Sequence, residues 1–247
     1  MKSLIYRLIN LLFPHYCLGC RTNGPIICKN CLAKIPPPER DLPRGIYSIF
    51  DYRDPVIKKA LWNLKYGNIP ELAYITAPLM YETIAEILYE EYALIEFKKV
   101  IVVPIPTSGD KTKKRTYNHA YKIAEAVVRH QNKLTMKNPA TILTIQGGSS
   151  KLNQNKWQLL DLLTKIKKTE RQAMVKGRDK RIKNIQGAYS IKKEFLKLNN
   201  TKSMHDLENS FFIIIDDITT TGASITEAMR ALKTLKPRHV FGITIAH

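Results

Sequence analysis

No stretch of the 247-residue sequence approaches the roughly 18 to 20 uninterrupted apolar residues that a membrane-spanning helix requires. The most apolar terminal segment, residues 1–13, is interrupted by Arg7 and Asn10, and no A-x-A cleavage site follows it. The sequence therefore predicts neither a membrane span nor a secretory signal, and the expected location is the cytoplasm. The apolar spacing of residues 1–13 instead favours an amphipathic helix that docks on the core or on a partner.

Acidic residues are also scarce, since 21 Asp and Glu stand against 40 Lys and Arg and give a formal net charge of +19. The excess is concentrated in residues 107–206, which hold 23 basic and 7 acidic residues. One interpretation of this segment is a solvated basic face. Such a charge density also favours a surface that binds nucleic acid or phosphate, so polyanionic partners are expected. The hydrophobic fraction of 44% is that of an ordinary globular protein and excludes a disordered or fibrous chain.

Cysteine is absent outside residues 17–31, which argues against the spread-out disulfide framework of small secreted domains. The four cysteines have the arrangement Cys17-x2-Cys20-x7-Cys28-x2-Cys31. Two thiolate pairs with this spacing can complete a tetrahedral Zn²⁺ site, and four cysteine ligands leave no open position for a substrate. The sequence therefore predicts a structural zinc knuckle, with a redox CxxC pair, a local disulfide or an iron–sulfur site as alternatives.

A proline-rich stretch follows the cysteines and contains three consecutive prolines at 36–38. Such a composition is typical of a stiff linker. We therefore expect three parts in the chain: an amino-terminal helix with the zinc knuckle at 1–35, a linker at 36–44 and a larger domain at 45–247.

The larger domain alternates short apolar runs with helical apolar stripes. The runs at 100–103, 211–215 and 240–245 predict buried strands. Apolar residues at helical spacing near 60–64, 80–88, 120–128 and 225–232 predict the helices. Strands that alternate with helices predict an α/β fold with a parallel sheet. The sequence does not decide the secondary structure of residues 134–164, because 141–145 has the pattern of a strand and 157–163 fits either a strand or a helix.

The most informative segment leaves the strand at 211–215 and continues as Asp216-Asp-Ile-Thr-Thr-Thr-Gly-Ala-Ser224. Two carboxylates at the end of the strand are followed by a hydroxyl-rich turn that opens a helix. Backbone amides at the helix N-terminus and the hydroxyls of Thr220, Thr221 and Ser224 would cradle a phosphate, and Gly222 lets the backbone approach the anion. The turn lacks the GK[ST] of nucleoside-triphosphate P-loops, so a phosphomonoester is the expected ligand.

Asp216 and Asp217 point in alternating directions at the end of the strand, so at least one is expected to face the phosphate site. Carboxylates in this position suit the hydroxyls of a ribose, and they also suit a Mg²⁺ ion that offsets repulsion among the anionic groups. The alternative is an ordinary helix N-cap preceded by acidic loop residues. The Thr-Thr-Gly continuation favours the ligand site.

The strand and its DDxxTTGxS continuation resemble the phosphoribosyl-pyrophosphate (PRPP) motif of type I phosphoribosyltransferases. Other segments narrow the resemblance to the ComF family. Its members combine an amino-terminal cysteine knuckle with a phosphoribosyltransferase-like domain and are associated with DNA uptake in natural competence. The similar segments span nearly the whole chain in the family's order: Leu11-Leu-Phe-Pro-x2-Cys17-x2-Cys20, Leu64-Lys-Tyr-Gly67, Val103-Pro-Ile-Pro106, Arg115-Thr-Tyr-Asn-His119, Thr169-x2-Gln172, Arg181-x2-Asn-Ile-x-Gly-Ala-Tyr189 and the PRPP segment.

The resemblance implies that the turn binds PRPP, with Mg²⁺ alongside, through Asp216, Asp217, Thr219, Thr220, Thr221, Gly222, Ala223 and Ser224. It also places the loop that contacts pyrophosphate after Val103. Candidate countercharges for pyrophosphate or DNA are Lys113, Lys114, Arg115, Arg171, Arg178 and Arg181; the alternative for the loop lysines is a solvated loop. The cations between 169 and 189 have a spacing that suits an extended phosphate backbone better than one small anion. The family's usual Arg-Gly-Phe-Asn-Gln is replaced here by Arg115-Thr-Tyr-Asn-His119, which leaves the loop geometry open.

The resemblance implies a competence protein that takes part in DNA uptake during natural transformation. Such a protein would bind single-stranded DNA through its basic middle region and PRPP at the turn. The alternative is an active phosphoribosyltransferase in nucleotide salvage or related metabolism. No acceptor pocket and no paired general acid and base stand out in the sequence, so no catalytic residue is assigned. The knuckle and the amino-terminal helix are also candidates for binding a helicase or another DNA-uptake protein.

Overall fold

The computed structural model of the chain describes residues 16–39, 41–67, 71–92, 99–107, 118–137, 157–167, 169, 177–196 and 207–247. Several predictions fall outside these ranges: the helix at 1–13, the strand at 141–145, and the candidate cations Lys113, Lys114, Arg115 and Arg171. Within the described part of the chain, every helix is too short or too polar to cross a membrane.

A five-stranded sheet forms the centre of the fold, and its strands are parallel. The strand order is β1-β7-β6-β2-β3, with β1 at Ile46–Phe50, β2 at Lys99–Pro104, β3 at Gln158–Leu159, β6 at Ser210–Ile218 and β7 at His239–Ala246. Strands β2, β6 and β7 are buried along nearly their whole length. Because both faces of the sheet are covered, these strands are near-continuous apolar runs in the sequence. The predicted α/β fold with a parallel sheet is confirmed.

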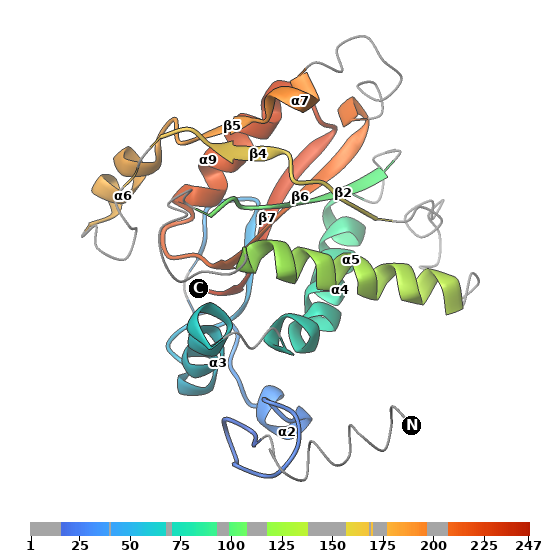
Figure 1. Cartoon of the computed structure of the whole chain (residues 1–247), viewed down its shortest axis with the longest axis vertical. Helices are drawn as coiled ribbons and strands as arrows, with labels where there is room; N and C mark the ends of the chain where they lie inside the picture. Colours follow the sequence, from blue (N-terminus) through green and yellow to red (C-terminus); the bar gives the residue numbers. More distant parts are fainter. Residues whose placement is uncertain are drawn as a thin grey trace.

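Two long helices cover one face of the sheet and a third helix covers the other (Figure 1). Helices α4 (Glu71–Tyr92) and α5 (His119–Lys137) pack together, and α5 lies against β2 and β6. Helix α9 (Ala223–Leu232) lies against β6 and β7. A β-carbon on Gly242 of β7 would lie 2.2 Å from Cγ2 of Ile225, so glycine at this position is what lets α9 approach the sheet so closely.

A small antiparallel sheet packs on α9. Strand β4 (Leu163–Lys165) pairs with β5 (Tyr189–Ile191), and α6 (Arg178–Ile185) precedes β5 in the sequence. The short helix α7 (Lys193–Leu196) follows β5. Residues 157–163, for which the sequence left strand and helix open, contain β3 and the first residue of β4. The strand alternative is therefore confirmed for this segment.

Helix α3 (Pro55–Tyr66) begins at a well-formed cap. The side chain of Asp54 accepts hydrogen bonds from the backbone amides of Val56 and Ile57 at 2.8 and 3.0 Å, which satisfies two of the amides that every helix start leaves open. The short helix α2 (Lys29–Leu32) belongs to the cysteine segment and lies next to α3 at the lower end of the molecule in Figure 1. Helix α3 thus lies between the cysteine segment and the sheet.

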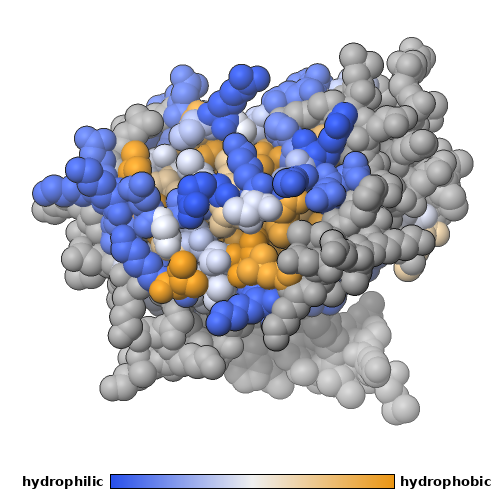
Figure 2. Space-filling view, turned by 90° about the horizontal axis from the view of Figure 1, so that it is seen from above, coloured by the Kyte–Doolittle hydropathy of each residue, from blue (hydrophilic) through white to orange (hydrophobic). Residues whose placement is uncertain are grey.

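One hydrophobic core joins the amino-terminal part of the chain to the sheet. Ile27 and Ile35, on either side of α2, belong to the same cluster of buried side chains as Phe211 and Phe241 in the centre of the sheet. Among the described residues seen from above, Figure 2 shows hydrophobic residues gathered near the middle of the face, with smaller hydrophobic spots toward the left, among hydrophilic side chains. The shared core means that the cysteine segment is packed onto the fold.

Candidate functional site

The predicted phosphate turn lies at the carboxyl edge of the sheet, where β6 ends. Pro104 at the end of β2 is in register with Ile215 of β6, and the amide of Ile105 donates a hydrogen bond to the Ile215 carbonyl at 2.9 Å. The side-chain amide of Asn118 donates to the carbonyl of Ile105 at 3.0 Å. The loop that follows β2 therefore starts beside the two aspartates. Loops that meet at the carboxyl edge of a parallel sheet are the usual position for a ligand.

Hydroxyl groups of the turn itself hold its shape. The amide of Gly222 donates a hydrogen bond to Oγ1 of Thr219 at 3.1 Å, and the amide of Ala223 donates to Oγ1 of Thr221 at 3.4 Å. Thr219 is only 6% exposed, so its hydroxyl serves the turn, whereas Thr220, Thr221 and Ser224 are accessible. Two of the amides expected to face a phosphate are thus engaged within the turn, and of the three hydroxyls that of Thr220 belongs to an exposed residue, whereas Thr221 and Ser224 are partly exposed.

Gly222 has the left-handed backbone conformation that favours glycine, with a φ of 73°, and it immediately precedes α9. A β-carbon at this position would lie 2.8 Å from Cδ1 of Ile46 and 3.0 Å from the ring of Pro43. Ile46 belongs to β1, and Pro43 belongs to the segment that the sequence presents as a linker. The turn therefore packs against Pro43 and Ile46, which are far from it in the sequence.

The two aspartates at the end of β6 have different neighbours. Oδ2 of Asp217 lies 3.0 Å from Nζ of Lys65 on α3, and Asp217 is 9% exposed. The carboxylate of Asp216 accepts a hydrogen bond from the amide of Asp217 at 2.8 Å. Burial, and after it the negative charge of Asp217, raise the pKa of Asp216 to about 8. The protonated form of Asp216 is therefore favoured more than in an ordinary aspartate, and a cation bound beside it would favour the ionised form.

Lys65 is a site residue that the sequence pattern did not identify. Helical spacing marked its neighbour Leu64 as a core position, and the family resemblance included the segment Leu64-Lys-Tyr-Gly67 without a role for the lysine. The Lys65 side chain is 23% exposed and reaches Asp217 because α3 packs beside the carboxyl edge of the sheet. A contact of this kind depends on tertiary packing, and no local spacing in the sequence signals it.

Tyr189 of β5 lies on another side of the turn and is 4% exposed. Its hydroxyl is hydrogen-bonded to the side chain of Ser224, and burial followed by the charge of Asp216 raises the pKa of the phenol. Buried Glu227 of α9 accepts a hydrogen bond from the amide of Gly187 at 2.9 Å. These contacts tie β5 to the start of α9. The burial of Tyr189 favours a packing role over stacking on a base.

With this geometry established, a comparison with protein families matches the phosphoribosyl transferase domain to residues 72–246. The chain belongs to the phosphoribosyl transferase domain family. The matched region contains β2, β6, β7 and the whole turn, whereas β1, α3 and the cysteine segment precede it. The edge strand, Lys65 and the cysteines therefore lie outside the matched residues. No curated protein matches the chain in a sequence search.

The candidate cations Arg178 and Arg181 lie on α6, within the residues matched to the phosphoribosyl transferase domain, and other described cations of residues 107–206, such as Lys122 and Arg129, lie on α5. Arg178 begins α6, Arg181 is half-buried on it, and Lys180 and Lys183 are exposed. Helix α6 packs against α9, the helix that begins at the turn. The structure therefore places this group of predicted basic residues near the helix of the phosphate turn.

The four cysteines converge around α2. Their sulfur atoms all lie within 4.8 Å of one another, and the Sγ atoms of Cys20 and Cys28 are 3.7 Å apart. Zn–S bonds of about 2.3 Å in tetrahedral geometry would place the sulfurs about 3.8 Å apart. The spacing of the thiols therefore fits a four-cysteine metal site.

The surroundings of the cysteines fit the same donor set. Burial raises the pKa of Cys17, but backbone hydrogen bonds, the first of them from the Cys28 amide, outweigh it and lower the pKa to about 6. The neighbouring sulfur of Cys28 contributes most to raising the pKa of Cys31 to about 12. A β-carbon on Gly19 would lie 2.7 Å from Sγ of Cys31, so a residue with no side chain is required beside this sulfur. The lowered pKa of Cys17 favours the thiolate, which is the form of cysteine that binds a metal ion.

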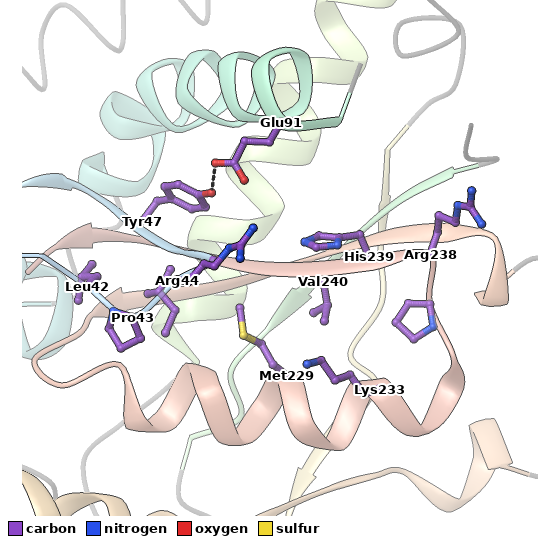
Figure 3. Close-up of a pocket in the computed structure, with 13 residues that line it drawn as sticks. Leu42, Pro43, Arg44, Tyr47, Glu91, Met229, Lys233, Arg238, His239 and Val240 are labelled. Atoms are coloured by element: carbon purple, nitrogen blue, oxygen red, sulfur yellow. Dashed lines mark hydrogen bonds between the residues drawn. The ribbon is translucent and has the colours of Figure 1, made fainter. Parts of the chain in front are cut away.

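A cavity of about 930 Å³ lies beside the first residues of β1 and β7, and none of the predicted site residues that the structure describes lines it. Figure 3 shows it between α9, from which Met229 points inward, and the segment that carries Pro43. Lys233 of the following 3₁₀ helix η2 (Lys233–Leu235) also lines it. Pro43 and Ile46 belong to this cavity and also support Gly222. The cavity therefore shares a wall with the turn but not its phosphate-binding groups.

Proposed function

We propose that this phosphoribosyl transferase domain binds PRPP at the turn after β6. The supporting observation is the order of groups along the chain. Asp216 and Asp217 stand at the carboxyl edge, accessible hydroxyls follow, and Gly222 in the left-handed conformation opens α9. The hydroxyls and the start of α9 would hold the phosphate of the ribose, and the aspartates would hold the ribose hydroxyls.

The other end of PRPP would lie toward the loop after β2. This loop starts at Ile105, which is hydrogen-bonded to Ile215 immediately before the aspartates. Asp216 and Asp217 are also the residues that would hold Mg²⁺, whose charge offsets repulsion between the carboxylates and the pyrophosphate. Lys65 supplies part of this compensation in the ligand-free chain through its ion pair with Asp217.

Calorimetry with PRPP and MgCl₂ tests the proposed site. Thr221→Val removes an accessible hydroxyl and keeps the shape of the side chain, so it should weaken PRPP binding about tenfold, the size expected for a hydrogen bond to a charged group. Thr226→Val is the matched control, because Thr226 is an exposed threonine on α9 beyond the turn. Absence of heat with the intact chain, or equal affinities of the Thr221 and Thr226 variants, would contradict the proposal.

At a finer level, we propose that the protein belongs to the ComF group, acts in the cytoplasm in DNA uptake during natural transformation, and binds single-stranded DNA. The support is the net charge of residues 107–206 and the exposed Lys180 and Lys183 on α6. Binding that releases counterions should weaken steeply as salt rises. Anisotropy of a labelled oligothymidylate at increasing NaCl concentration tests this part, and a flat salt dependence would count against it.

The family also contains transferases, so phosphoribosyl transfer is the alternative function. It predicts that pyrophosphate is released from PRPP when a suitable base is present, and that Asp217→Asn abolishes the release. A coupled pyrophosphate assay across a panel of purine and pyrimidine bases separates the two possibilities. Turnover with any base would assign the transferase activity, and PRPP binding without turnover would favour the role in DNA uptake.

We also propose that Cys17, Cys20, Cys28 and Cys31 hold a structural Zn²⁺ ion. The convergence of their sulfur atoms supports this assignment, and four thiolate ligands would leave the ion closed to substrate. Because Ile27 and Ile35 share the core of the larger domain, the ion would stabilise the position of the cysteine segment on the fold. The same segment is the proposed contact for a helicase or another DNA-uptake protein.

A further inference from the structure

The face of α3 that points away from the core combines aromatic and basic side chains. The stripe Ile57, Ala60, Leu61 and Leu64 is buried, and the opposite side exposes Lys58, Lys59, Trp62 and Tyr66. We refer to these four exposed residues as the α3 face. Residues 55–66 contain no Asp or Glu, so no acidic side chain of the helix offsets this charge.

The two aromatic residues of the α3 face form a pair. Trp62 is 59% exposed and Tyr66 is 61% exposed, although both are large enough to add much to a core. They are one helical turn apart, and their ring centroids are 5.6 Å apart with planes inclined at 45°. Single exposed apolar residues are common on protein surfaces, whereas adjacent exposed aromatic side chains indicate an interaction site.

The cations of the α3 face extend it toward the cysteine segment. Nζ of Lys58 lies 5.8 Å from the ring centroid of Tyr52, which is itself exposed. Lys59 lines a hollow of about 440 Å³ together with Arg21 and the exposed Tyr16 of the cysteine segment. Basic and aromatic groups therefore alternate from the cysteine segment along α3.

The other end of α3 reaches the proposed PRPP site. Lys65 follows Trp62 by three residues and pairs with Asp217 at 3.0 Å. At a rise of about 1.5 Å per residue, Trp62 and Lys65 are only about 5 Å apart along the helix axis. A chain bound along the α3 face would thus end beside the carboxyl edge of the sheet.

We propose that the α3 face binds single-stranded nucleic acid, with bases stacked on Trp62 and Tyr66 and backbone phosphates held by Lys58 and Lys59. The inference rests on the proposed binding of single-stranded DNA and assigns the base contacts to α3, outside residues 107–206. Stacking needs the flat faces of unpaired bases, which a duplex does not present. The positive charge favours a polyanion over a neutral or basic protein surface.

Tryptophan fluorescence provides a direct test, because the chain contains two tryptophans and the second, Trp157, is 4% exposed. An oligothymidylate of about 15 nucleotides, long enough for a single-strand site, should quench the emission of Trp62 in the intact protein. Trp62→Phe should lose most of the quenching and keep the affinity within about threefold, because phenylalanine still stacks. Trp62→Ala should weaken binding about tenfold, since stacking contributes about 1–3 kcal/mol per base.

The phosphate contacts are tested by the salt dependence. The double variant Lys58→Gln with Lys59→Gln should flatten the plot of log affinity against log salt by about 1.4, at about 0.7 for each cation lost on a single strand. Tyr89→Ala is the matched control, because Tyr89 is an exposed tyrosine at the far end of α4. This variant should leave quenching, affinity and slope unchanged, and circular dichroism should show the same unfolding midpoint for all these surface variants.

The outcomes separate this inference from the proposed function. If oligothymidylate binds but Trp62→Ala and the double lysine variant bind as tightly as the intact chain, the α3 assignment is wrong and DNA binding stands. If oligothymidylate does not bind the intact chain, both are wrong, and calorimetry with PRPP still decides the phosphoribosyl site. If it binds while the emission of Trp62 stays unchanged, the α3 face is overturned as the nucleic-acid site, and an acidic protein becomes the better occupant.

Discussion

Lys65 and Asp217 form an ion pair across the boundary of the region that matches the phosphoribosyl transferase domain. Nζ of Lys65, on a helix that precedes the matched residues, lies 3.0 Å from Oδ2 of Asp217 at the end of β6. Both side chains are largely buried, with exposed fractions of 23% and 12%. Helix α3, which precedes the matched residues, therefore contributes a charge to the candidate site and connects it with the cysteine segment.

Removal of the Lys65 charge should destabilise the ligand-free protein. Lys65→Met keeps the aliphatic stem and leaves the Asp217 carboxylate buried without this cation, so the free energy of unfolding should fall by about 1–3 kcal/mol, less than for a fully buried pair. Urea unfolding at pH 7.5 measures this change. In the double variant with Asp217→Asn, much of the loss should be recovered, with a coupling energy of about 1 kcal/mol. Additive effects of the two substitutions would show that the pair is not coupled.

Gly222→Ala should both destabilise the fold and weaken PRPP binding. The substitution places a β-carbon at a φ of 73°, and this atom would meet Cδ1 of Ile46 at 2.8 Å. Gly187→Ala is a matched control, because Gly187 has a φ of 71° and no atom within 4 Å of a built β-carbon. Both variants carry the left-handed strain of about 1–2 kcal/mol, and the clash should cost Gly222→Ala about 1 kcal/mol more.

Urea unfolding and calorimetry with PRPP separate the two effects of the Gly222 substitution. Gly187→Ala should keep the affinity for PRPP. Gly222→Ala should lower this affinity at least tenfold, because the new β-carbon pushes the turn away from Ile46 and Pro43. Equal stability losses in the two variants would show that Ile46 and Pro43 give way without cost.

The parts of the fold that the sequence predicted are those whose burial leaves a local pattern. Strands β2, β6 and β7 are buried on both faces, and each is a continuous apolar run. Strand β1 lies at the edge of the sheet, and its three central residues are only half-buried, so no such run marks it. Strands β4 and β5 have three residues each, too few to show an alternating pattern.

The same limit applies to the candidate site. The aspartates, the threonines and Gly222 are contiguous in the chain, so the sequence alone indicates that they share one turn. Two other contacts join residues from distant segments: Pro43 and Ile46 pack against Gly222, and Lys65 pairs with Asp217. Only the packing of α3 and β1 beside the carboxyl edge creates these contacts, so spacing along the chain could not predict them.

The raised pKa of Asp216 predicts a pH dependence of stability in the metal-free protein. The ordinary pKa of an aspartate is about 3.9, whereas burial and Asp217 raise that of Asp216 to about 8 in the folded chain. The folded state therefore binds more protons than the unfolded state between these values. The contribution of Asp216 to the free energy of unfolding is greatest below about pH 4, falls as the pH rises to about 8, and is level above that.

Asp216→Asn should remove this fall. The amide is neutral at every pH and can still accept the hydrogen bond from the backbone amide of Asp217, so the variant should be more stable than the intact chain at pH 8, by up to about 5 kcal/mol for a pKa raised from about 3.9 to about 8, and similar to it near pH 4. Urea unfolding in EDTA at pH 5, 6.5 and 8 measures the trend. Asp179→Asn, at an exposed aspartate of α6, should follow the intact chain. A variant that is destabilised equally at every pH would indicate that Asp216 is ionised in the folded state.

Zinc content and cooperative unfolding test the cysteine cluster together. The purified protein should contain one zinc ion per chain by elemental analysis, and Cys20→Ser should lose it, whereas Cys20→His should retain it because histidine also binds Zn²⁺ in four-ligand structural sites. Ile27 and Ile35 pack into the core of the sheet, so removal of the ion should destabilise the whole protein. A loss of about 2 kcal/mol would lower the unfolding midpoint by about 4–8 °C in one transition. An unchanged midpoint, with a separate early transition for the cysteine segment, would show that this segment unfolds independently of the phosphoribosyl transferase domain.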